Sequence, residues 1–299
     1  MRVSTPWAQK SGTQSMLKQQ SELIQTQLKL SSGKRILTPS EDPRAAVQIV
    51  DLKQNIKQTE QYQENTNTAR QRLSMEETAL QNIIESVHRV RELGVQGLND
   101  TNSANNRKGI AAELDQLNQQ ILSMANTKNS NGEYLFAGFL SDKIPFAEQT
   151  PATTPATFNY SGDDNQRQIQ IGPTRTITDG NPGEDVFGTS GTDSLFEIVD
   201  ELAAGLKNDN PPAGALDKLT SSLEKVLTVQ ATIGARLNAL DRQENLNEDD
   251  ILGMQTVLSE TEDLDFAEAI SKFNLQSVSL QAAQQAYTKV QGLSLFNFL

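Results

Sequence analysis

The stretch LSSGKRI at residues 30–36, followed by SEDPRAA at residues 40–46, marks a break between two helical segments. Gly33 can adopt the positive φ of a helix C′ residue, so we expect a first helix over about residues 11–30 to end there. Asp42 before Pro43 is typical of an N-cap followed by proline in the first helical turn. The sequence therefore predicts that one helix ends near Gly33 and that another begins near Pro43.

The first helix is too weakly apolar to be stable alone. Met16, Leu23 and Leu30 recur at heptad spacing, which gives a narrow apolar seam. Short helices in water are marginal without tertiary packing, so this helix needs a partner. The surrounding arm is basic within an acidic protein, with Glu22 as its acidic residue up to position 35.

The chain that follows carries the clearest helical periodicity. Apolar positions step by fours and threes, and only Glu76 and Gly94 depart from the pattern, which is typical of a coiled coil. The seam consists of Ala69, Leu73, Glu76, Leu80, Ile83, Val87, Val90 and Gly94. A polar break follows, with Ser103 as the predicted N-cap of the next helix. That helix is expected to stop near Asn131–Gly132 and to pair antiparallel with its predecessor.

The region after Glu133 loses the helical periodicity and changes in composition. Prolines, glycines and short β-prone runs predict strands at residues 158–160, 168–171 and 174–178. Helices are expected again from Ser194, where Ser194 and Glu197 fit a capping box. Apolar seams over residues 195–206, 216–240 and 269–290 support that expectation.

The expected fold is mainly α with a small β-rich insert. It is elongated, with the N- and C-terminal helices paired in a coiled coil or helical bundle and the β domain at the tip. The predicted division is terminal helical arms at 1–42 and 266–299, a helical rod at 43–135 and 192–265, and an insert at 136–191.

The composition excludes several classes of function. The 299 residues carry a net charge of −12, which does not suit a nucleic-acid partner. The chain has no cysteine, so a thiolate metal site lacks its ligands. A catalytic triad or a histidine metal site would have to use the single histidine, His88, which we interpret as a flanking side chain of a helical rod because it lacks partners and a pocket. No apolar run approaches the ~18 residues that span a membrane. The sequence predicts no enzyme, no cofactor, no metal site and no membrane insertion, and it shows no cleavable signal peptide.

Charge is distributed unevenly between the two ends of the chain. Residues 243–271 contain nine acidic side chains and no lysine or arginine. We hypothesise that Lys29, Lys34 and Arg35 meet the acidic stretch at residues 260–268 when the arms pair. Exposed charge pairs contribute about 0–1 kcal/mol each, so they would set register more than stability.

The chain finishes with an unusually apolar segment, LSLFNFL at residues 293–299. Chain ends are normally polar unless they dock onto something. These side chains could fold back onto the chain's own bundle or be buried between subunits, and exposed they would favour aggregation. We favour burial between subunits.

The segments at residues 30–46 and 293–299 resemble the N- and C-terminal signatures of bacterial flagellins and hook-associated proteins. The stretch NGEYLFAG at residues 131–138 is similar to a motif of the group that joins hook to filament. The resemblance implies terminal arms that become a coiled coil in the assembled flagellum. It also implies export through the flagellar type III apparatus to an extracellular location, without a cleaved signal peptide, and an export chaperone that binds near the C-terminus.

The implied function is structural: a homo-oligomeric ring that contacts the preceding hook–filament junction protein on one side and flagellin on the other. The residues expected to serve assembly, by seam packing, chain reversal, capping and subunit burial, are Leu30, Gly33, Arg35, Ile36, Asp42, Pro43, Leu293, Leu295, Phe296, Phe298 and Leu299. Two alternatives remain at this point. The first is flagellin itself, the filament subunit, and the second is an intracellular coiled-coil scaffold.

Overall fold

The computed structural model describes residues 5–149, 156–188, 194–210 and 212–292. The chain forms two compact units. The end unit comprises residues 1–58 and 250–299, and the core unit comprises residues 59–249. Two helices, α2 (Pro43–Gly97) and α6 (Ala215–Glu262), each contribute to both. None of the helices in the described ranges is apolar over a length that would cross a membrane. The three-part division of the chain at residues 42, 135, 191 and 265 stays a prediction.

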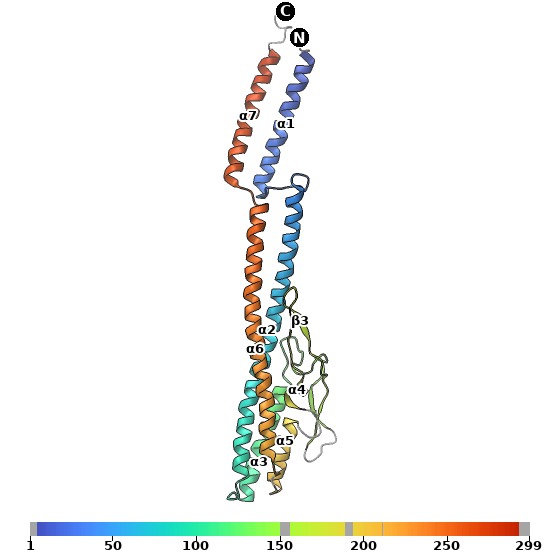
Figure 1. The fold of residues 1–299 in the computed structure, drawn as a ribbon, viewed down its shortest axis with the longest axis vertical. Coiled ribbons are helices and arrows are strands. Elements are labelled where there is room, and N and C mark those ends of the chain that lie inside the picture. Colours follow the sequence, from blue (N-terminus) through green and yellow to red (C-terminus); the bar gives the residue numbers. More distant parts are fainter. Residues whose placement is uncertain (1–4, 150–155, 189–193, 211, 293–299) are drawn as a thin grey trace, which may run out of the picture. The chain divides into compact units, whose positions relative to one another are not determined.

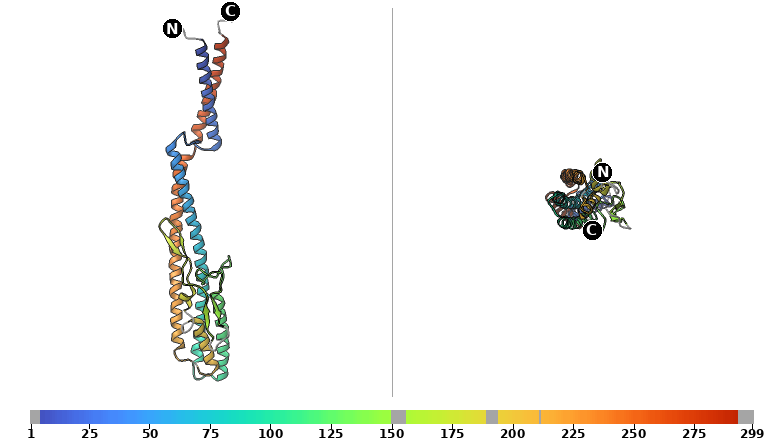
Figure 2. Two further views of the ribbon diagram at one scale, coloured as in Figure 1. Left: turned by 90° about the vertical axis from the view of Figure 1, so that its right-hand side faces the viewer. Right: turned by 90° about the horizontal axis from the view of Figure 1, so that it is seen from below.

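The end unit is built from paired helices. Helix α1 (Thr5–Ser32) lies beside α7 (Phe266–Gly292), and both views show the two chain ends at the same end of this pair, so the helices are antiparallel (Figures 1 and 2). The start of α2 and the end of α6 complete the unit. The predicted partnership of the two weak terminal helices is therefore present in the structure.

The core unit is a helical bundle whose seams are those that the sequence predicts. Helix α3 (Ala104–Ala125) packs against α5 (Leu195–Lys207), and both lie beside α2 and α6 (Figure 1). Every apolar member of the α2 seam is fully buried or nearly so. Gly94 interrupts the seam because a side chain there would come within 2.9 Å of Leu216 and 3.1 Å of Leu202.

The β-rich insert contains two separate antiparallel hairpins. Strands β1 (Phe146–Glu148) and β2 (Phe158–Tyr160) form the first, and β3 (Gln168–Gln170) and β4 (Thr176–Thr178) form the second. Phe146 is opposite Tyr160, and Ile169 is opposite Ile177. A short helix, α4 (Gly183–Phe187), follows the second hairpin. Strands β2, β3 and β4 confirm the predicted ones, whereas β1 and α4 were not predicted.

An aromatic cluster joins the insert to the bundle. Phe146 of β1 packs on Phe187 of α4 with ring centroids 5.4 Å apart, and on Phe196 of α5 at 4.9 Å. Phe136 and Phe158 extend the same cluster. Edge-to-face and tilted contacts of this kind add stability beyond the burial of apolar area. The insert is therefore an integral layer of the core unit.

The insert lies along the flank of the helices within the core unit. Asn65 of α2 donates to the Gln170 carbonyl at 2.7 Å, and Asn247 of α6 donates to the Ile171 carbonyl at 3.2 Å. The helix turns near residues 98–103 and 208–214 form the end of this unit instead (Figures 1 and 2). We expected the insert at the tip; these polar contacts to the middle of α2 and α6 hold it at the side.

Two expectations about helix ends were wrong in detail. Helix α3 stops at Ala125 rather than near Asn131–Gly132. The Asn126 side chain accepts from the Phe146 amide at 3.0 Å and donates to its carbonyl at 2.8 Å, so β1 fixes the chain where the helix ends. Ser194 occupies the N-cap of α5, but its side chain makes no capping hydrogen bond. Glu197 instead accepts from the Phe158 amide at 3.2 Å.

The carboxylate that interrupts the α2 seam anchors the insert. Glu76 is fully buried and accepts hydrogen bonds from the Asn181 amide at 3.2 Å and from its side chain at 2.9 Å. Arg236 of α6 donates to the same Asn181 side chain at 3.0 Å. Burial raises the pKa of Glu76 to about 8, although the bonds from Asn181 favour the charged form. At neutral pH this site therefore favours a neutral carboxyl group.

The pKa of Glu76 predicts that the core unit loses stability as pH rises. The folded-state pKa of about 8 lies above the ordinary 4.5, so the stabilisation is complete below the ordinary value and is lost as pH rises through the folded value. Each unit of pKa difference corresponds to about 1.4 kcal/mol. The unfolding free energy of Glu76→Gln, minus that of wild type, should therefore rise by roughly 2 kcal/mol or more between pH 5 and pH 9. Urea unfolding followed by circular dichroism measures both values.

The exposed Glu85 on the same helix provides the matched control. Glu85→Gln should follow the wild-type pH dependence. If Glu76→Gln and wild type keep a constant difference in unfolding free energy across this range, Glu76 is ionised in the folded protein and the expectation is wrong.

Candidate assembly interface

The break that the sequence predicts is a joint at which the two ends of the chain are hydrogen-bonded together. Helix α1 ends at Ser32, and the Gly33 amide donates to the Lys29 carbonyl at 2.9 Å. The Leu264 amide then donates to the Gly33 carbonyl at 3.0 Å, and the Arg35 amide donates to the Glu262 carbonyl at 2.8 Å. These bonds form a short antiparallel bridge between the α1–α2 linker and the α6–α7 linker.

Gly33 is required for its backbone conformation. Its φ is +69°, a region that residues with a Cβ rarely adopt. Space is not the constraint, because a Cβ would meet its nearest neighbour, Phe266, at 3.7 Å. The predicted C′ role of this glycine is therefore present in the structure.

Glu262 is the electrostatic centre of the joint. Its carboxylate accepts hydrogen bonds from Lys34 at 2.7 Å and from Lys53 of α2 at 2.6 Å, and its side chain is only 11% exposed. The hydrogen bond from Lys34, and next the one from Lys53, lower the pKa of Glu262 below its ordinary value. The same contact raises the pKa of Lys34. One carboxylate thus ties the linker after α1 to the first turns of α2 and the last turn of α6.

Arg35 and Asp42 complete the joint. The Arg35 guanidinium donates through Nε and Nη2 to the Thr261 carbonyl, at 3.1 and 2.9 Å, and its Nη1 lies 3.8 Å from the Asp42 carboxylate. Asp42 Oδ1 accepts from the Ala45 amide at 3.1 Å, so Asp42 caps α2 with Pro43 as the first helical residue. Arg35 therefore caps the end of α6 while Asp42 caps the start of α2.

The hypothesised meeting of basic arm and acidic stretch occurs in part, within one chain. Lys34 pairs with Glu262 as expected. Lys29 pairs with Glu41 at 2.7 Å, and Arg35 contacts a carbonyl and Asp42 rather than the acidic side chains at 260–268. The sequence does not predict the contact of Lys53, because a position inside a long helix gives no local signal that it meets residue 262.

The remaining residues expected to serve assembly are placed as follows. Leu30 and Ile36 are half-buried beside the joint, and Pro43 is exposed. The apolar ending lies outside the described residues; its members are Leu293, Leu295, Phe296, Phe298 and Leu299. An assembly role for this set of residues stays a prediction.

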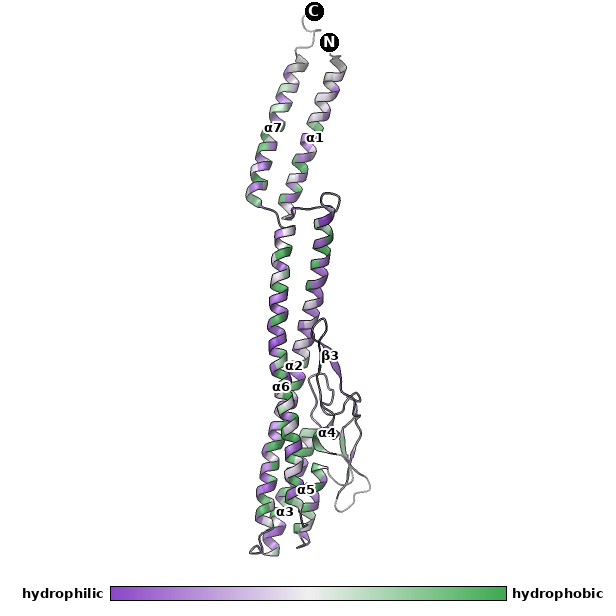
Figure 3. Cartoon of the chain, viewed as in Figure 1, coloured by the Kyte–Doolittle hydropathy of each residue, from purple (hydrophilic) through white to green (hydrophobic). Residues whose placement is uncertain are grey.

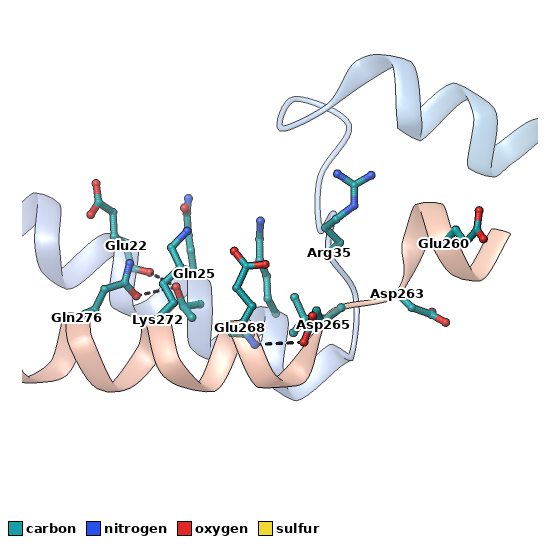
Figure 4. Close-up of a pocket in the computed structure, with 13 residues that line it drawn as sticks. Glu22, Gln25, Arg35, Glu260, Asp263, Asp265, Glu268, Lys272 and Gln276 are labelled. Carbon is teal, nitrogen blue, oxygen red and sulfur yellow. Dashed lines mark hydrogen bonds between the residues drawn. The ribbon is translucent and has the colours of Figure 1, made fainter. Parts of the chain in front are cut away.

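A polar groove of about 670 Å³ lies beside the joint, between α1 and α7 (Figure 4). Within it, the Thr26 hydroxyl donates to the Gln276 side chain at 2.8 Å and joins the two helices. Asp265 caps α7 by accepting from the Ala267 and Glu268 amides. Among the described residues no group of histidine, cysteine or acidic side chains is arranged to hold a metal ion. The polar side chains of this groove therefore serve to join α1 to α7 and to cap α7 by hydrogen bonds.

The end unit exposes more apolar side chains than the larger core unit does. Twelve of the large apolar side chains exposed in the described chain belong to the end unit and six to the core unit. Leu275 is the most exposed, at 72%. Green segments alternate with purple ones along α1 and α7 in Figure 3. The twelve are Trp7, Leu17, Ile24, Leu28, Val47, Val50, Leu252, Val257, Phe266, Ile270, Leu275 and Val278.

Comparison with known proteins gives matches to flagellar proteins. Residues 3–140 match the model of the bacterial flagellin N-terminal helical region. Flagellar hook-associated protein 3 of Escherichia coli (strain K12) is 32% identical, over 99% of this chain and 99% of its own. A phase 1 flagellin of Salmonella naestved is 36% identical, but over only 38% of this chain and 23% of its own.

The fold also matches a solved structure. The flagellar junction protein FlgL of Legionella pneumophila superposes with a TM-score of 0.58 and 21% identity, covering 74% of this chain and all of the other. At that identity the likeness bears on the fold alone.

The joint yields a test of Glu262. Glu262→Gln keeps the shape of the side chain but removes the charge that holds two lysines. The linker should open more often, so trypsin should cut after Lys34 and Arg35 severalfold faster than in wild type. Mass spectrometry of a digestion time course measures this directly.

The neighbouring Glu260 makes the control, because it lies in the same helix turn but forms no ion pair with any residue that the structure describes. Glu260→Gln should be cut at the wild-type rate. Equal rates in Glu262→Gln and wild type would mean that the two lysine contacts do not close the joint.

Proposed function

The chain belongs to the family of flagellar hook-associated protein 3, and from that premise we propose that it forms the junction between hook and filament as a ring of identical subunits. It is a structural protein of the bacterial flagellum. The observation that carries the proposal, beside the full-length match, is the concentration of exposed apolar side chains on the end unit. Such surfaces on a monomer mark sites of protein contact.

The physical argument runs from the joint to assembly. Helix α1 leaves tryptophan, leucine and isoleucine side chains in solvent, and α7 leaves phenylalanine, isoleucine, leucine and valine side chains there. Apolar residues outside the seam of a helix pair favour a further contact. Burying them against another protein would stabilise the assembly by about 25 cal/mol per Å² of apolar surface. In a ring, neighbouring copies would cover these faces. The apolar ending at residues 293–299 would add to the same buried surface.

The partners follow from the position in the flagellum. An adaptor ring has one face for the preceding hook–filament junction protein and one for flagellin. An export chaperone that binds near the C-terminus would shield the apolar ending before assembly. Passage through the flagellar type III apparatus would bring the chain to the cell surface without a cleaved signal peptide.

Flagellin itself remains the second candidate within the family. The flagellin match covers 38% of this chain, whereas the hook-associated match covers 99%. The difference favours the junction role over bulk polymerisation. The membership in a flagellar family removes the grounds for an intracellular scaffold.

A clean deletion in the host distinguishes the two flagellar roles. We expect hooks without filaments by electron microscopy and flagellin monomer shed into the medium, because filament subunits would have no adaptor to polymerise on. Bare hooks without shed flagellin would instead identify this chain as the filament subunit. Restoring the gene on a plasmid should restore filaments.

A further inference from the structure

A second groove, in the core unit, is basic in an otherwise acidic protein. It has a volume of about 570 Å³ and lies between one face of α2 and the end of α3. Met75, Ala79 and Met124 form its apolar part, and methionine side chains adapt readily to a partner's shape. Its charged residues are Arg70 and Lys128, and no acidic side chain lines it.

Lys128 is the cation in this groove that is open to a partner's carboxylate. It is exposed and lies over the Tyr134 ring, with 4.5 Å between its Nζ and the ring centroid. Arg70, by contrast, already pairs with Asp241 and Glu244. The groove thus presents apolar surface with a positive charge at its edge, which suits an acidic segment that carries a few apolar side chains.

The chain itself contains such a segment, on an exposed face of α6. Val257 is 39% exposed and stands seven positions after Asp250, close to two helical turns, so the two side chains share one face of the helix within the end unit. Gly253 lies between them on that face. A side chain at Gly253 would meet nothing within 4 Å, so this part of the helix is open to close approach by another chain.

We propose that the α6 face formed by Asp250, Gly253 and Val257 packs into the α2–α3 groove of a neighbouring copy of this chain. Asp250 would meet Lys128, and Val257 would meet the methionine-lined surface. The inference rests on the proposed ring, since it names one contact between its subunits. Such a contact joins two different surfaces, and a head-to-tail interface of this kind closes into a ring when its rotation permits.

Charge supports a second copy as the occupant. The groove offers the Lys128 cation in a chain of net charge −12, and the α6 face lies in the acidic stretch at residues 243–271. Helix-in-groove recognition uses a few apolar anchors for affinity and flanking charges for orientation. This chain contains both the groove with its cation and a helix face with an apolar anchor and an acidic residue.

A charge-swap experiment tests the contact. Lys128→Glu and Asp250→Lys should each lower the number of filaments per cell severalfold, because each places like charges together. The double variant should recover most of the loss, since the pair is restored with its signs exchanged. Lys225→Glu, at an exposed position of α6 outside the groove, is the matched control and should leave filaments unchanged.

Disulfide trapping identifies the occupant. The chain has no cysteine, so single variants Lys128→Cys and Asp250→Cys can be produced together in one cell and oxidised in purified flagella. A disulfide-linked dimer of this chain is expected from the mixture and from neither variant alone, which excludes links within one copy.

The outcomes separate this inference from the proposed function. A cysteine at 128 linked to a protein of another mass would overturn the second-copy assignment, as would a double charge variant no better than the worse single one. Filaments that assemble normally while the mixture gives no dimer would overturn the contact and leave the junction role standing. Normal filaments in the deletion strain would instead overturn the junction role.

Discussion

The end unit depends on one constraint: its two terminal helices are too weakly apolar to be stable alone, so the chain must return to its beginning. The return is fixed by the bridge between Gly33 and Leu264, by the capping of α6 by Arg35, and by the Glu262 carboxylate, which two lysines hold. These contacts are polar and few. They determine where the helices meet, but they leave much apolar surface of the pair in solvent. We therefore propose that neighbouring copies cover this surface in the assembly.

The core unit is completed differently. Its helical seams close on one another, and the β-rich insert is bound to them by the aromatic cluster around Phe146 and by the buried contacts of Glu76 with Asn181. A second buried carboxylate, Asp179, pairs with Arg167 on the insert. Such groups stabilise one arrangement because an unpaired partner would be costly in the interior. The core unit is thus closed on itself and presents surfaces such as the α2–α3 groove, whereas we propose that the apolar surface of the end unit is buried on assembly.

The sequence predicts the parts of this structure that show a periodic or local pattern. The three-four spacing identified the seams of α2, α3, α5 and α6, and Gly33, Asp42 and Pro43 identified the break between α1 and α2 because their backbone chemistry is local. It did not predict the end of α3, since Asn126 stops that helix through a contact with β1, twenty residues later in the chain. Nor did it reveal Lys53 as a partner of Glu262. Glu76 is recognisable in the sequence as a polar residue in an apolar seam. Its partner Asn181 is not recognisable, because it lies in a loop that has no periodic pattern. Local sequence patterns do not predict which distant segments of the chain contact each other.

Hydrogen exchange tests the central claim, that the end unit is incomplete until subunits assemble. Amide exchange would be measured by mass spectrometry in the purified monomer and in isolated flagella. Amides of α1 and α7 should exchange quickly in the monomer and slowly in the flagellum, while the core-unit seams should be protected in both, because the end unit exposes more of its apolar side chains. Equal, strong protection of α1 and α7 in the monomer would contradict the account, since the pair would then be stable without neighbours.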